Sequence, residues 1–144
     1  MGTVMELGFE ECAKLLSAGV VGRVALATPG GPHIVPVNYA VDEESVLIAT
    51  SPYSVLGTYG RRSMVAFEVD GFDPVREEGW SVVVRGRAEP LDPVELREVG
   101  ERQASQPWAE GTRSLCLRIP WTEISGRRIA ARRGIPAPRS LDLA

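Results

Sequence analysis

The chain has 144 residues, of which 44% are hydrophobic and 24% are charged. This length suits one domain with a single core, and this composition excludes fibrous, disordered and disulfide-framework proteins. The net charge of −3, from 16 Lys+Arg against 19 Asp+Glu, gives no overall attraction to a polyanion, so nucleic acid is not expected as a partner. We expect one domain over 1–144, with a core from about 9 to 130 and a loose or partner-draped tail over 131–144.

The cysteine and histidine content argues against a metal site. One histidine and two cysteines without CxxC spacing cannot form a four-ligand site without several carboxylates. Cys12 and Cys116 lie in apolar segments, which is typical of buried thiols in a reducing compartment. Neither a signal-peptide pattern nor eighteen consecutive apolar residues occurs. We therefore expect a cytoplasmic protein that has no membrane partner.

The first half of the chain predicts a short helix followed by an antiparallel meander. Apolar residues at helical spacing predict the helix, over 9–18. An alternating, β-branched-rich segment predicts a strand over 21–27, and turn residues on either side of 33–41 predict two more strands, over 33–41 and 45–50. The connections between these strands are short, so the strands must run antiparallel. Pro52 and two glycines then break the pattern over 51–60, which has room for one helical turn.

The second half predicts more strands and a second helix. The predicted strands are 63–70, 80–91, 114–119 and 122–129, and the charged segment 71–79 is predicted as a loop. Asp92 and Pro93 are typical of a helix start, here for a helix over 95–103. Six or seven antiparallel strands with two or three short helices indicate a mostly β barrel or sandwich.

No set of side chains for covalent or acid-base catalysis can be assembled from the sequence. The chain has one histidine and lacks the GxSxG, Walker and GxGxxG motifs. The catalytic residues are therefore left unassigned. Any demanding chemistry would be carried by a bound cofactor.

The order of the elements and six phrases resemble the pyridoxamine 5′-phosphate oxidase-like FMN-binding split-barrel family, closest to its short, nitroimidazole-reductase-like bacterial branch. The likeness covers roughly residues 9 to 130. The phrases are VGRVAL, GGPHIVPVNYAVD, SVLIATSPYS, VAFEVD, GWSVVVRGRAEPL and LRIPWTEISGRRI. The resemblance implies an antiparallel split β-barrel of Greek-key type. It also implies a homodimer that holds FMN in a groove between its subunits and acts on a small molecule.

The family's flavin contacts can be carried over onto matching positions. The strand Pro36, Val37, Asn38 and Tyr39, together with Val35 before it, would run beneath the flavin ring, with backbone groups at its pyrimidine edge. Read on its own, this segment is also an ordinary barrel strand. A proline within it requires an edge or a bulge, where one backbone acceptor is left for a ligand.

The resemblance also implies a phosphate site. Thr50, Ser51 and Ser54 occupy the turn that receives the flavin phosphate in the family. The better-known oxidases carry a basic residue shortly after that serine, whereas Val55 and Leu56 stand here. The arginines that could supply the missing charge are Arg61, Arg62, Arg87 and Arg128.

Trp80 and Ser81 stand where the family places a polar contact to the ring, and Arg128 belongs to the family's last strand. Trp80 is equally suited to anchor a core or an interface.

Three functions follow from these residues. The first is a flavin-dependent oxidoreductase. The second is a reductase that uses the 8-hydroxy-5-deazaflavin coenzyme, whose anionic tail suits an arginine-rich chain with Lys14 as its only lysine. The third is a non-catalytic flavin- or haem-binding dimeric module.

Overall fold

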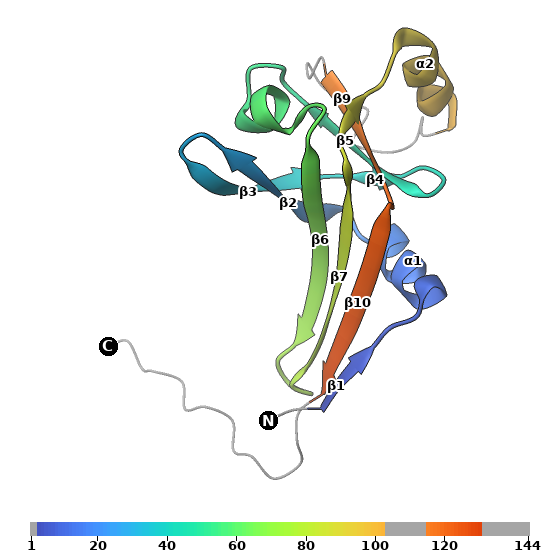
Figure 1. The fold of residues 1–144 in the computed structure, drawn as a ribbon. Helices are drawn as coiled ribbons and strands as arrows, with labels where there is room; N and C mark the ends of the chain where they lie inside the picture. The colour runs from blue at the N-terminus through green and yellow to red at the C-terminus, as the bar shows by residue number, and fades with distance from the viewer. Residues whose placement is uncertain (1–2, 103–114, 131–144) are drawn as a thin grey trace.

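A computed structural model describes residues 3–102 and 115–130, and the predicted tail 131–144 lies outside the described residues. Within them the chain forms two antiparallel sheets, two α-helices and one π-helical turn (Figure 1). The elements are β1 (Thr3–Glu6), α1 (Phe9–Ala18), β2 (Val21–Thr28), β3 (Gly31–Asn38), β4 (Ala40–Val41), β5 (Ser45–Thr50), η1 (Leu56–Gly60), β6 (Met64–Asp73), β7 (Glu78–Arg87), β8 (Glu89–Pro90), α2 (Pro93–Arg102), β9 (Leu115–Pro120) and β10 (Glu123–Ala130).

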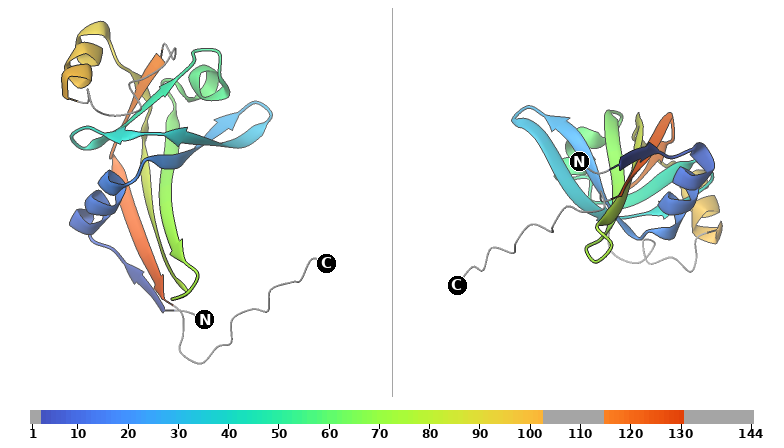
Figure 2. Two further views of the ribbon diagram at one scale, coloured as in Figure 1. Left: turned by 180° about the vertical axis from the view of Figure 1, so that it is seen from behind. Right: turned by 90° about the horizontal axis from the view of Figure 1, so that it is seen from below.

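The larger sheet has the order β1-β10-β7-β6-β2-β3, and the smaller one has the order β4-β5-β9-β8. The long strands β6, β7 and β10 run crosswise to the β2–β3 hairpin, as Figures 1 and 2 show from the front and from behind. Every second side chain of β2 is buried between the sheets, as expected for a half-buried strand. Fully buried core residues include Val24, Phe67, Val84, Leu117 and Ile119. The predicted mostly β barrel is confirmed.

The predicted strand 33–41 is divided at Tyr39, where the chain passes from the larger sheet to the smaller one. The Tyr39 hydroxyl donates a hydrogen bond to the carbonyl oxygen of Leu16, and its ring packs edge-on against Phe67. Burial raises the pKa of Tyr39 to about 12. This tyrosine therefore ties α1 to the point where the two sheets diverge.

The segment 71–79, predicted as a loop, is a turn over 74–77 with strand on both sides, so the prediction is wrong at its two ends. β6 continues to Asp73, which pairs with Glu78 at the start of β7. Glycines and charges made the segment resemble a loop in the sequence. In the structure the Trp80 ring covers Gly71, where a Cβ atom would come within 2.6 Å of the indole Nε1. The β6–β7 ribbon consequently extends well below the β2–β3 hairpin (Figure 1).

The second predicted helix is confirmed, together with its start. The Asp92 carboxylate accepts a hydrogen bond of 2.8 Å from the backbone N–H of Glu95, and Pro93 is the first residue of α2. Val99 of α2 is fully buried in a small second cluster with Leu47 and Cys116. The helix therefore covers the smaller sheet.

A buried carboxylate fastens α2 to the β4–β5 hairpin. The Asp42 side chain is 3% exposed. It accepts two hydrogen bonds of 2.8 Å from Arg102 and lies 3.4 Å from Arg118. Arg118 also donates a hydrogen bond of 2.6 Å to Ser45. The hydrogen bonds from Arg102 outweigh the effect of burial and lower the pKa of Asp42. We call these four residues the Asp42 cluster.

None of the helices within the described ranges is long and apolar enough to span a membrane. In the same ranges, no group of three or more His, Cys, Asp and Glu side chains is placed to hold a metal ion.

Candidate functional site

β3 lies at an edge of the larger sheet, as Pro36 requires. The half-buried Val35 and Val37 pack against the core, so they have only backbone groups to offer a ligand on this face. Pro36 and Asn38 are exposed, and together with Val21 and Val37 they line a hollow of about 180 Å³. Three of the predicted strand residues, Pro36, Val37 and Asn38, therefore border one small hollow on the edge strand of the described sheet.

The turn after β5 is held by its own hydroxyl groups. The Ser54 hydroxyl donates to the Ser51 carbonyl oxygen at 2.7 Å and accepts from the Gly57 N–H at 2.9 Å. It also lies 2.8 Å from the Thr50 hydroxyl. The Ser51 hydroxyl accepts from the Tyr53 N–H at 3.2 Å and still has its own proton to donate. Of the three predicted phosphate ligands, Ser51 is therefore the most available, and Ser54 mainly shapes the turn.

The position where the family carries a cation points into the protein. Leu56 is 1% exposed and packs against Gly60. Gly57 lies so close to the turn that a Cβ atom there would be 2.2 Å from the Ser51 carbonyl oxygen. Arg61 and Arg62 follow directly on η1 and are exposed, and neither forms an ion pair within the described ranges. These two arginines are therefore the nearest cations in sequence to the predicted phosphate turn.

A shallow apolar hollow lies on the outer face of the larger sheet, and its lining includes Met64, where β6 begins after η1. Its volume is about 310 Å³. The residues that line it include Ala25, Ala27, Ala66, Pro32, Met64 and Arg85. We call this surface the alanine shelf. Since Ala25 pairs with Ala66 across β2 and β6, this part of the shelf carries no side chain larger than a methyl group. Arg85 also lines the hollow, and within the described residues its guanidinium makes a single, long ion pair of 3.7 Å with Glu123.

Trp80 and Arg128 lie side by side at the far end of the β6–β7 ribbon. They are paired across β7 and β10 and line a hollow of about 260 Å³. Arg128 forms an ion pair of 3.0 Å with Glu11 of α1. The structure therefore gives Arg128 a partner within the chain, which reduces its availability for a phosphate.

Ser81 points to the opposite face of the sheet from Trp80. There it lies beside Arg127, which was not among the site residues predicted from the sequence. It pairs with Arg127 across β7 and β10. Both residues, with Ser125 and Glu68, line a trough of about 500 Å³ on the outer face. Arg127 makes no ion pair within residues 3–102 and 115–130. Strand alternation separates Arg127 from Arg128, but only the β7–β10 register shows which of them accompanies Ser81.

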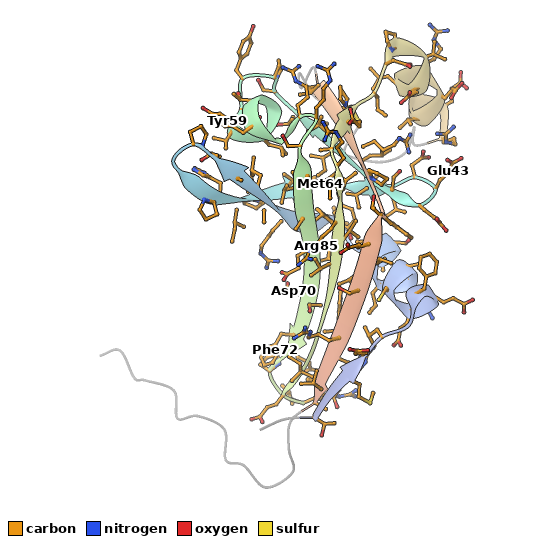
Figure 3. The ribbon with its side chains drawn as sticks, viewed as in Figure 1. Glu43, Tyr59, Met64, Asp70, Phe72 and Arg85 are labelled. Carbon is orange, nitrogen blue, oxygen red and sulfur yellow. The ribbon has the colours of Figure 1, made fainter. Side chains whose placement is uncertain are left out.

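One protomer does not bring all the predicted residues together. Met64 begins β6 close to η1, whereas Trp80 pairs with Gly71 seven residues further along the strand, roughly 23 Å away at strand spacing. Figure 3 shows this separation, with Tyr59 and Met64 at one end of the ribbon and Asp70 and Phe72 at the other. Residues 36–38 border a hollow of their own on β3, and residues 50–54 form the turn before η1. Trp80 with Arg128 and Ser81 with Arg127 lie further along the ribbon, on opposite faces of the sheet.

Comparisons with known proteins agree with this fold. The model of the pyridoxamine 5′-phosphate oxidase family matches residues 9–128. An uncharacterised protein of Mycobacterium tuberculosis is 33% identical over 89% of this chain and 87% of its own length.

Two solved structures are similar over most of the chain. The FAD-binding protein from Mycobacterium smegmatis has 31% identity and a TM-score of 0.74, over 88% of this chain and 98% of its own. An FAD-binding protein from Mesorhizobium loti has 27% identity and a TM-score of 0.72, over 91% of this chain and 100% of its own. The chain belongs to the pyridoxamine 5′-phosphate oxidase family.

Proposed function

We propose that the protein is a homodimeric, flavin-dependent oxidoreductase of the cytoplasm that acts on a small molecule. One observation carries this proposal: the alanine shelf is an open apolar surface on β2 and β6, and β2 packs against η1, which follows the hydroxyl turn. Arg61 and Arg62 come directly after η1, are exposed and have no ion-pair partner in the described ranges. A flat apolar surface next to an anion site suits a ring system that carries a phosphate. The two similar proteins named for FAD support the same ligand class.

The residues of the shelf fit a flavin ring. Ala25 and Ala66 have no side chain beyond Cβ, so a planar ring can lie close to the strands. Arg85 remains charged at any working pH. Its guanidinium at the rim would stabilise negative charge on the ring. The Ser51 hydroxyl would donate a hydrogen bond to the phosphate. A bound flavin supplies hydride and electron transfer, and the chain supplies position and charge.

The outer face of the larger sheet suits a second copy of the chain. Ile34 and Met64 are 69% and 59% exposed on this face, and exposed apolar strips are typical of interfaces. Ser81 lies four residues from Arg85 along β7, roughly 13 Å away, on the same face. In the proposed dimer, the partner's Ser81 and the partner's Arg127 cover the shelf of the first protomer. The two groups of predicted residues then form one composite site.

The proposal is tested by titrating the purified protein with FMN, FAD and the 8-hydroxy-5-deazaflavin coenzyme while following fluorescence. We expect saturable binding of a flavin at one per protomer, together with a dimer by sedimentation equilibrium. Turnover with a nicotinamide donor and a panel of quinones and nitro compounds should follow. Preference for the deazaflavin coenzyme, a haem absorption band, or binding without turnover would each contradict the proposal.

A variant that fills the shelf makes the test specific to this surface. Ala66→Phe should abolish flavin binding, since its ring would occupy the hollow that Ala66 leaves open. The matched control is Val75→Phe in the ribbon turn, where the side chain is 91% exposed. The control should bind flavin like the parent protein. Equal binding by both variants would place the ring elsewhere.

A further inference from the structure

The trough on the outer face of the larger sheet contains a cation and a carboxylate that the rest of the described chain leaves unpaired. Its volume is about 500 Å³, within the range of small-molecule sites. Arg127 and Glu6 both line it and stand directly opposite each other on β10 and β1. Side chains paired in this way lie on one face, with their Cβ atoms roughly 5 Å apart. Within the described residues, neither side chain forms an ion pair with the other or with a third group.

The second carboxylate that lines the trough already has a partner. Glu68 accepts a hydrogen bond of 3.2 Å from Arg23, and Arg23 also forms an ion pair of 3.2 Å with Asp70 on the same face. Of the charged residues that line the trough, Arg127 and Glu6 are therefore the two that remain open to a ligand. Their charges have opposite signs, so a ligand that satisfies both must itself carry both charges.

The uncharged residues of the trough suit the same ligand. The hydroxyls of Ser81 and Ser125 make no hydrogen bond within the described ranges, and Ser81 pairs with Arg127 across β7 and β10. Each hydroxyl has a proton to donate to a carboxylate that Arg127 holds. The half-buried Val83 pairs with Ser125 and adds apolar surface to the lining. The trough thus offers an arginine fork with hydroxyls beside it, and a carboxylate opposite.

We propose that the trough binds a small zwitterion, in which Arg127 holds the carboxylate and Glu6 holds the ammonium group. That this zwitterion is the substrate rests on the proposed function, in which the trough of one protomer covers the alanine shelf of its partner. The planar fork of an arginine matches a carboxylate, and charge-assisted hydrogen bonds are stronger than neutral ones. A ligand with only one of the two charges leaves the opposite charge of the trough without a partner.

Three probes that differ by one charged group test the inference by isothermal titration calorimetry. Free L-phenylalanine carries both groups, hydrocinnamate lacks the ammonium group, and phenethylamine lacks the carboxylate. The protein, with or without FMN, should bind L-phenylalanine about tenfold more tightly than either of the other probes, in line with one hydrogen bond to a charged group. Equal affinity for the three probes, or no binding of L-phenylalanine, would overturn the inference and leave the proposed function intact.

Two variants should separate the two charges of the trough. Arg127→Met should weaken the binding of L-phenylalanine and hydrocinnamate about tenfold and should not weaken that of phenethylamine. Glu6→Gln should weaken the binding of L-phenylalanine and phenethylamine and should not weaken that of hydrocinnamate. Arg127→Lys keeps the charge without the planar fork and should restore part of the affinity for hydrocinnamate. Equal weakening of all three probes by either variant would overturn the inference, because a general disturbance of the trough lacks this selectivity.

Matched controls come from charged residues outside the trough. Arg76→Met in the ribbon turn removes an exposed cation, and Glu10→Gln on α1 removes an exposed carboxylate. Both variants should bind the three probes as the parent protein does. A change of selectivity in either control would show that the net charge of the protein, and not the trough, distinguishes the probes.

Absorption spectra of the FMN-loaded protein test whether the zwitterion is the substrate. L-phenylalanine should shift the flavin bands over the same concentrations at which it binds, because the proposed dimer places the trough over the ring. Binding that leaves the bands unchanged, or that FMN blocks, would overturn the assignment as substrate. If the protein takes up no flavin but still distinguishes the three probes, the proposed function fails and the zwitterion site stands.

Discussion

The Asp42 cluster and the trough use the same kinds of side chain in opposite ways. In the Asp42 cluster, the buried carboxylate has two arginine partners, and Arg118 also donates a hydrogen bond to the Ser45 hydroxyl. In the trough, Arg127 and Glu6 are exposed and have no ion-pair partner within the described ranges. Arginines that the chain satisfies itself hold the fold together. Exposed arginines that have no ion-pair partner in the described part of the chain are available to an anionic ligand.

Removing the carboxylate of the Asp42 cluster should have the largest effect on stability. Asp42→Asn leaves Arg102 and Arg118 without their charged partner near a buried site. We expect a loss of about 3 kcal/mol in the free energy of unfolding, at the lower end of the range for a broken buried pair because Arg102 is 44% exposed. Urea unfolding measures this loss. The FAD and FMN affinities of the folded variant should not change. A loss of flavin affinity without loss of stability would show that the Asp42 cluster serves binding and not the fold.

Gly57→Ala should be the next most disruptive change. An added Cβ atom would lie 2.2 Å from the Ser51 carbonyl oxygen, so the turn must open. We expect a loss of about 2 kcal/mol, as for an overpacked site, together with weaker flavin binding. Gly100→Ala is the matched control, because a Cβ atom there meets nothing within 4 Å and alanine favours the helix. If both variants were equally stable and bound flavin equally well, the turn would not shape the site.

Substitutions of Ser54 and Ser51 should have different effects, because Ser54 shapes the turn and Ser51 is the proposed phosphate ligand. Ser54→Ala removes a hydroxyl with three short contacts and should cost about 1 kcal/mol of stability. Ser51→Ala should leave stability within about 0.5 kcal/mol and weaken binding of FMN and FAD about threefold to tenfold. Thermal unfolding and fluorescence titration on the two variants measure these effects. The opposite ranking would show that Ser54 is the phosphate ligand.

Acid should weaken the Asp42 cluster in a predictable direction. The pKa of Asp42 is lowered in the folded protein by the hydrogen bonds from Arg102. The unfolded chain therefore binds the proton more readily, and the stabilisation is complete above the unfolded pKa of about 4. It is lost as the pH falls through the lower, folded value. The difference in unfolding free energy between the parent and Asp42→Asn should shrink between about pH 5 and pH 2. A difference independent of pH would show that the charge of Asp42 is unimportant.

Arg128→Met should have the smallest effect. Its ion pair with Glu11 is half-exposed, with side chains 35% and 49% accessible, and such pairs contribute about 0–1 kcal/mol. Arg127→Met removes a residue that faces the trough with Ser81 and should reduce turnover without a comparable change in stability. Steady-state kinetics on the two variants compare them. A greater loss of turnover in Arg128→Met than in Arg127→Met would show that Arg128, as predicted from the sequence, is the arginine of the site.

The strand framework and the start of α2 could be predicted because both depend on local patterns. Alternating residues predicted β2, a short segment after a polar turn predicted β5, and Asp92 with Pro93 predicted the start of α2. The limits of the β6–β7 ribbon could not be predicted, because the packing of Trp80 over Gly71 overrides the usual effect of glycine. The division of a predicted strand at Tyr39 depends on a hydrogen bond to Leu16, 23 residues away in the chain.

Part of the site could also be predicted, namely the part that depends on local sequence patterns. The edge position of Pro36 follows from the missing N–H of proline, and the hydroxyl turn follows from its composition. The choice between Arg127 and Arg128 depends on the register of β10 against β7, which no local pattern specifies. The alanine shelf joins residues of β2 and β6 that are about forty positions apart in the sequence, so it appears only when the strands are paired.

Native mass spectrometry of the protein as purified tests the central claim most directly. The composite site predicts a dimer that carries two flavin molecules, with the absorption bands of an oxidised flavin. A monomer that retains flavin would contradict the composite site, and a dimer that neither retains nor takes up any flavin would contradict the account as a whole.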